Sequence, residues 1–186
     1  MSDTQLLGGW SNPEPLTEHD KHVFEKAFGG QVGIYCKPHL VSRQVVNGIN
    51  YAFFCGAISR AVPPQIGFAI ADAHETTDGT VSRTNIKTYG MAPGMLHSSG
   101  QWSDATPLDD HDTAVFDNAT KGLSGTQHIP NLVSHQTIDS GKNYRYFCTC
   151  KSQAHANATG ISIIMINQNA PEAEGAVRIV NISTFG

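Results

Sequence analysis

The chain has 186 residues, of which 39% are hydrophobic and 15% are charged, and its formal net charge is −4. This balance is typical of a soluble globular protein and excludes a disordered acidic tail or a highly charged nucleic-acid binder. Because Lys and Arg form no run, we expect neither nucleic acid nor an anionic membrane as a partner. The longest apolar stretch, residues 161–166, is far too short to span a bilayer.

The first half has the pattern of one helix followed by four strands. Thr17 is a candidate N-cap, apolar residues follow it at helical spacing, and Gly29 and Gly30 end the pattern, which predicts a helix over residues 17–28. Apolar and aromatic runs between turn residues then predict four strands, over residues 39–46, 49–60, 66–73 and 81–89.

The second half repeats the first. Identical residues at matching places include Trp10/Trp102, His19/His111, Leu40/Leu132, Tyr51/Tyr144 and Cys55/Cys148. The matches predict a helix over residues 109–120 and strands over residues 132–138, 143–151, 160–166 and 176–184. A unit of roughly 90 residues can close a core of its own. We therefore expect two domains, residues 1–92 and 100–186, joined by a linker at 93–99.

The four cysteines are Cys36, Cys55, Cys148 and Cys150. Only Cys55 and Cys148 are equivalent in the repeat, so the pattern does not favour a duplicated disulfide framework. We expect buried free thiols and therefore a cytoplasmic location, with secretion as the alternative. The N-terminus lacks the basic and apolar regions of a signal peptide.

The segment between the first two strands carries a resemblance. Residues 44–51 read QVVNGINY, and Asn47-Gly48 is a strong hairpin signal. This segment closely resembles the cystatin signature, in which a Q-x-V-x-G hairpin precedes a strand that often contains N-Y. Gly8 and Gly9 precede the helix, as the glycine trunk does in cystatins. His74-Glu75 stands where some stefins, the intracellular cystatins, carry a similar pair.

The resemblance implies an α+β fold class, with two tandem cystatin-like domains, each one helix packed on a four- to five-stranded antiparallel sheet. It also implies a reversible inhibitor of papain-like cysteine proteases, without catalytic chemistry or a cofactor. In such inhibitors the N-terminal trunk and two hairpin loops form a wedge that enters the active-site cleft. A rigid hairpin loses little conformational entropy on binding.

The resemblance also implies the protease-binding residues of domain 1, which are Gly8, Gly9, Gln44, Val45, Val46, Asn47, Gly48, His74 and Glu75. A weaker second site would comprise Gln136, Thr137, Ile138, Asp139, Ser140 and Gly141. Its turn is longer, and Asp139 would have to be desolvated in a cleft, so we expect inhibition chiefly through domain 1. Trp10 and Trp102 either lie at a binding edge or pack against the helix start.

An enzyme is not expected. The chain contains no nucleophile elbow, phosphate-binding loop or dinucleotide fingerprint. Cys55 or Cys36 with a histidine could form a nucleophile pair, but Cys55 lies mid-strand, where a thiol is usually inert. The nine histidines lack metal-ligand spacing, so no metal site is expected. The alternative function is a non-inhibitory protein-interaction module that retains the cystatin fold.

Overall fold

The computed structural model describes residues 9–93, 100–152, 159–169 and 176–185 of the chain. The first half contains β1 (Glu14–Pro15), α1 (Glu18–Phe28), β2 (Ile34–Val46), β3 (Gly48–Ser59), β4 (Gln65–Glu75) and β5 (Val81–Pro93). The second half contains α2 (Asp110–Thr120), β6 (Thr126–Ile138), β7 (Gly141–Ser152), β8 (Thr159–Asn169) and β9 (Val177–Phe185).

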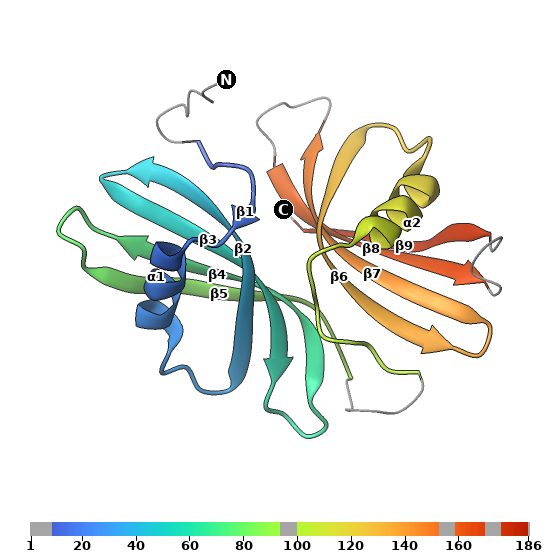
Figure 1. Ribbon diagram of the computed structural model, residues 1–186, viewed down its shortest axis with the longest axis horizontal. Coiled ribbons are helices and arrows are strands. Elements are labelled where there is room, and N and C mark those ends of the chain that lie inside the picture. Colours follow the sequence, from blue (N-terminus) through green and yellow to red (C-terminus); the bar gives the residue numbers. More distant parts are fainter. Residues whose placement is uncertain (1–8, 94–99, 153–158, 170–175, 186) are drawn as a thin grey trace.

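The strands form two antiparallel sheets, one from each half (Figure 1). The strand order is β1-β2-β3-β4-β5 in the first sheet and β6-β7-β8-β9 in the second. From β2 onward, each strand in a sheet therefore pairs with the strand that follows it in the chain. The β2–β3 turn is tight, because Val46 pairs directly with Gly48. The β6–β7 turn is one residue longer, with Ile138 paired to Gly141.

Both helices begin at a capping box. In α1 the Thr17 hydroxyl accepts from the backbone N–H of Asp20, whose carboxylate accepts from the backbone N–H of Thr17. Asp109 and Asp112 do the same at the start of α2. Each helix starts one residue later than the predicted range and ends at the predicted residue. At 11 residues each, neither described helix is long and apolar enough to cross a membrane.

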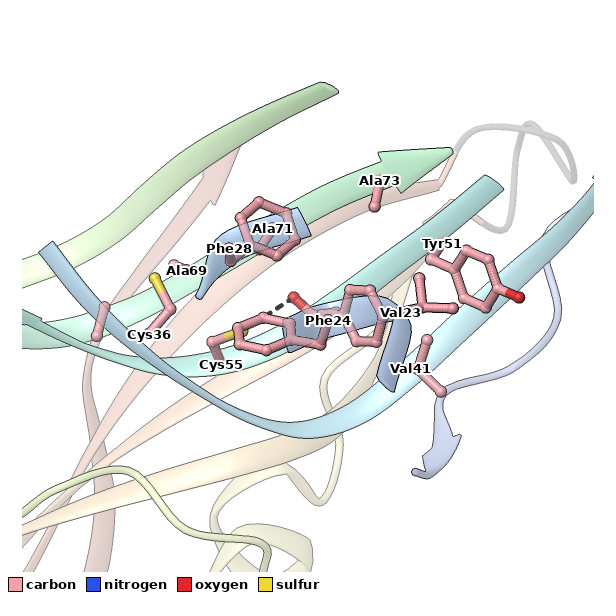
Figure 2. Packing of buried hydrophobic residues seen from close by; sticks show 12 residues of the cluster. Val23, Phe24, Phe28, Cys36, Val41, Tyr51, Cys55, Ala69, Ala71 and Ala73 are labelled. Carbon is pink, nitrogen blue, oxygen red and sulfur yellow. Dashed lines mark hydrogen bonds between the residues drawn. The ribbon is translucent and has the colours of Figure 1, made fainter. Parts of the chain in front are cut away.

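Each helix packs on one face of the sheet in its own half. In the first half, Val23, Phe24 and Phe28 of α1 contact alternate residues of the strands, among them Tyr51, Phe53, Cys55, Ala69, Ala71 and Ala73 (Figure 2). In the second half, Val115 and Phe116 of α2 pack with Tyr144 and Tyr146 of β7. These positions follow the two-residue period of a strand, in which successive side chains point to opposite faces.

The opposite faces of the two sheets pack against each other and form a shared core. Its buried members come from both halves and are Phe54, Phe68, Tyr89, Ala105, Leu132, Phe147 and Ile163. Phe147 of β7 is its centre, with ring-centroid distances of 5.0 Å to Phe68, 5.3 Å to Tyr89 and 6.0 Å to Phe54. Separating the halves would expose this apolar surface to water.

A buried cation crosses the same interface. Arg145 of β7 is 3% exposed and donates to the backbone carbonyls of Gly90 and Ile66, which belong to the first sheet. Its guanidinium lies over the rings of Phe68, at 5.2 Å, and Trp102, at 4.5 Å. No carboxylate in the described ranges forms an ion pair with it, and burial lowers its pKa to about 10. Arg145 therefore ties β7 to the first sheet.

These observations correct the predicted fold class. The α+β class with two tandem cystatin-like domains is wrong, because strands hold most of the described residues and only two short helices are described. Each half has a core of its own beneath its helix, and a third cluster, which includes Phe54 and Phe147, is shared by the two halves. The first long strand of each half is longer than predicted, with β2 starting at Ile34 and β6 at Thr126. The domain limits stay a prediction, and residues 94–99 of the predicted linker lie outside the described ranges.

Candidate binding edges

Backbone pairing aligns the predicted wedge segments at one end of the first sheet. Trp10 bridges to Gln44, which pairs with Asn50 of β3, and Asn50 pairs with His74 of β4. The residue before Trp10, the β2–β3 turn and the β4–β5 loop therefore leave the sheet at the same end (left in Figure 1). We call residues 9–10, 44–48 and 74–80 the first edge.

The β2–β3 turn requires glycine at position 48. Gly48 has a φ of +109°, which L side chains rarely adopt. A Cβ atom built there would lie 2.2 Å from the carbonyl oxygen of Glu75 and 3.1 Å from the His74 ring. The first hairpin therefore lies directly against the start of the second loop, and no larger residue fits between them.

The first edge presents apolar side chains to solvent. Trp10 is 49% exposed, Val45 37% and Val46 43%. Large apolar side chains exposed together on one rim are typical of a surface that a partner covers. The sequence left two places open for Trp10, and the structure gives it a solvent-exposed one beside β2.

His74 and Glu75 point in different directions. The His74 ring Nδ1 donates to Asn50 Oδ1 at 2.8 Å, on the face of the sheet away from α1. The Glu75 carboxylate accepts from Tyr51, at 2.7 Å, and from His19 of α1, at 2.9 Å. Burial raises the pKa of Glu75, but these hydrogen bonds outweigh it and hold the pKa below its usual value. Only 14% of the Glu75 side chain is exposed, so its main contact is with α1 and not with solvent.

The β4–β5 loop is held by its own hydrogen bonds. The Thr76 N–H donates to the Thr80 carbonyl at 2.9 Å, and the Gly79 N–H donates to the Thr76 carbonyl at 3.0 Å. Asp78 accepts from the Thr76 hydroxyl and from the Thr80 N–H. These bonds lower the pKa of Asp78, so the loop carries a negative charge at neutral pH.

The second half has a corresponding edge. Trp102 bridges to Gln136, which pairs with Asn143, and Asn143 pairs with Asn167. We call residues 100–102 and 136–141 the second edge; it lies at the other end of the molecule (right in Figure 1). Its turn holds Asp139 and Ser140, both exposed. Residues 170–175, which include most of the predicted second loop, lie outside the described ranges.

The structure thus brings together nearly all the predicted residues of each site. Gly9, Gln44, Val45, Val46, Asn47 and Gly48 lie in the first edge beside His74 and Glu75, and Gln136, Thr137, Ile138, Asp139, Ser140 and Gly141 lie in the second. Gly8 lies outside the described residues. Sequence reasoning missed Asn50, although its pairing with Gln44 follows by counting outward from the tight turn.

Possible metal-ligand clusters and the two equivalent cysteines among the described residues bear on catalysis. No group of three or more His, Cys, Asp or Glu side chains in the described ranges could hold a metal ion. Cys55 and Cys148 are both fully buried at equivalent places, and burial raises the pKa of each thiol. A protonated, inaccessible thiol is a poor nucleophile.

The sequence was also compared with known proteins. Neither the protein-family models nor the curated proteins gave a match. The geometry of the two edges is therefore the basis for assigning a function.

Proposed function

We propose that the chain is a reversible inhibitor of papain-like cysteine proteases, acting chiefly through the first edge. The observation that carries the proposal is the alignment of three segments, at Trp10, Gly48 and Thr76, along one end of a single sheet. Such an alignment gives a thin rim that fits a long, narrow cleft. The resemblance of residues 44–51 to the cystatin signature favours a protease cleft over others.

The chemistry of the rim supports a blocking role. Trp10, Val45 and Val46 supply exposed apolar surface, which drives association when it leaves water. Val45 and Val46 pair with Ile49 and Gly48 in the β2–β3 hairpin, so this segment cannot extend across a catalytic centre as a substrate would. The rim is already ordered by sheet pairing, so binding costs little conformational entropy. The buried thiols favour a reducing compartment, and a cytoplasmic location is part of the proposal.

The test is titration of papain activity with the intact chain and a matched pair of variants. Gly48→Val strains the first turn and collides with Glu75, so the tip must change shape. Gly141→Val strains the second turn, where φ is +139°. We expect Gly48→Val to weaken inhibition about a hundredfold, on the scale of the strain energy of such a residue, and Gly141→Val to inhibit like the parent.

Two results would contradict the proposal. The first is a folded intact chain that leaves several papain-like proteases fully active. The second is equal loss of inhibition in both glycine variants. The first result would favour the alternative function, a non-inhibitory protein-interaction module. Intact chain is used because separated halves would expose the shared core.

A further inference from the structure

Three polar side chains form a continuous row across the strands at the first edge. Gln44, Asn50 and His74 occupy directly paired positions on β2, β3 and β4. His74 Nδ1 donates to Asn50 Oδ1 at 2.8 Å, and Asn50 Nδ2 donates to Gln44 Oε1 at 2.9 Å. We call these residues the first ladder. Gln44 and Asn50 lie two pairs inside the last pair of the β2–β3 hairpin, and His74 lies one residue inside the last pair of the β4–β5 hairpin. The ends of a strand pair are where it is most prone to open.

The second half builds the same row with one different residue, and we call Gln136, Asn143 and Asn167 the second ladder. Asn167 Nδ2 donates to Asn143 Oδ1 at 2.8 Å, and Asn143 Nδ2 donates to Gln136 Oε1 at 2.8 Å. The row then continues to the N-terminal segment, because Gln136 Nε2 donates to the Gly100 carbonyl at 2.7 Å. Asn167 thus takes the donor role that His74 has in the first ladder. The donor-to-acceptor direction is the same in both rows.

We propose that the first ladder positions the parts of the first edge relative to one another. Gln44 is also the residue to which Trp10 bridges, so the ladder joins the strands that carry the N-terminal segment, the first turn and the second loop. Asn50 is the central positioning residue, because its amide serves as acceptor on one side and donor on the other. Side-chain bonds across paired strands restrain their relative shift and opening.

The expected effect on inhibition rests on the proposed function. The expected effect on the conformational order of the first edge does not. A rim whose parts shift against each other must be ordered when it binds, and this ordering weakens affinity. Loss of the ladder should therefore slow association and raise the dissociation constant. It should also lower the backbone order parameters of Trp10 and Gly48 in the free protein, whether or not a protease is bound.

The experiment compares four variants of the full chain. His74→Leu and Asn50→Leu break the first ladder. His74→Asn installs the residue type that the second ladder uses. Asn143→Leu is the matched control, because it breaks the second ladder at the equivalent position. The readouts are amide ¹⁵N relaxation of the free protein and association and dissociation rates with papain.

We expect Asn50→Leu and His74→Leu to lower the order parameters at Trp10 and Gly48 and to weaken papain binding about tenfold. His74→Asn should restore both readouts to within about twofold of the parent, because one donated bond is replaced by another. Asn143→Leu should leave both unchanged at the first edge. Unchanged order parameters in Asn50→Leu, or equal loss in His74→Asn and His74→Leu, would overturn the ladder proposal.

The ladder and the inhibitor proposals fail in different ways. If the relaxation data change as expected but the parent chain does not bind papain, the ladder proposal is supported and the inhibitor proposal is contradicted. Papain binding that persists in all four variants with unchanged relaxation would contradict the ladder alone.

Discussion

The two edges are built from equivalent residues, yet their tryptophans have different environments. Trp10 of the first edge is 49% exposed. Trp102 of the second edge lies under the Arg145 guanidinium, at 4.5 Å. Arg145 has the small residue Ala52 at its equivalent place in the first half, so no cation can cover Trp10 from there. Trp102 thus packs against the cation that joins the halves, whereas Trp10 is exposed to solvent.

The two halves also differ in the side chain that links each helix to its sheet. Arg43 of β2 donates to Asp20 of α1 through Nε, at 2.9 Å, and through a terminal nitrogen. In the second half His135 of β6 donates to Asp112 of α2 at 2.7 Å. Hydrogen bonding to Asp20 raises the pKa of Arg43, which stays charged over the whole physiological range. The first half therefore keeps a permanent ion pair beside its exposed rim.

The largest expected effect tests whether the two halves that carry these edges unfold as one unit. Phe147→Ala should lower the free energy of unfolding by about 3 to 5 kcal/mol, because the ring contacts both sheets and its loss leaves a cavity. Urea unfolding with amide hydrogen exchange measures this. Exchange should accelerate in β3 and β4 as well as in β7. The control, Phe116→Ala, lies in the core of the second half alone and should act mainly there. Unaltered exchange in the first sheet of Phe147→Ala would mean that the two halves unfold as independent units.

An intermediate effect distinguishes the two tryptophans. Trp10→Ala should weaken papain inhibition about tenfold with little change in stability, because the side chain is half exposed and lies in the proposed binding edge. Trp102→Ala should inhibit like the parent but lose about 2 kcal/mol of stability, since the stacking partner of Arg145 is removed. Inhibition kinetics and urea unfolding of both variants are the measurements. If the losses were interchanged, the proposed roles of the two edges would be reversed.

The smallest effect concerns pH at the junction of the halves. Burial lowers the pKa of His39 in β2, and nearby Lys37 lowers it further. His39 therefore binds a proton more readily in the unfolded chain than in the folded chain. The free energy of unfolding is not reduced by this effect above about pH 6.5, and it declines as the pH falls below that value. His39→Asn, which installs the residue found at the equivalent Asn131, should flatten the dependence of stability on pH between about 5 and 7. Chemical denaturation at several pH values tests this, and an unchanged slope would contradict it.

Local signals in the sequence predicted the helices and the first turn. Thr17 and Asp109 mark the helix starts, and Asn47-Gly48 marks the hairpin, because caps and tight turns depend on a few neighbouring residues. The shared core was not predicted. Tyr51, Phe53 and Phe54 are apolar on both faces of β3, and periodicity does not say what covers the second face.

The ladder was only partly predictable. The tight turn fixes the pairing of Gln44 with Asn50, so this contact follows from counting along the hairpin. The place of His74 depends on the β3–β4 register, which is set by the longer connection over residues 60–64 and by tertiary packing. The role of Arg145 depends on how the two sheets meet, and no local pattern encodes that arrangement.

The most direct test of the central claim is a hydrogen-exchange footprint of the intact chain bound to papain. The proposed inhibitor predicts protection at residues 9–11, 45–48 and 76–80, with exchange at residues 100–102 and 137–141 unchanged. Protection confined to the second edge, or none at the first, would contradict the claim that the first edge enters the protease cleft.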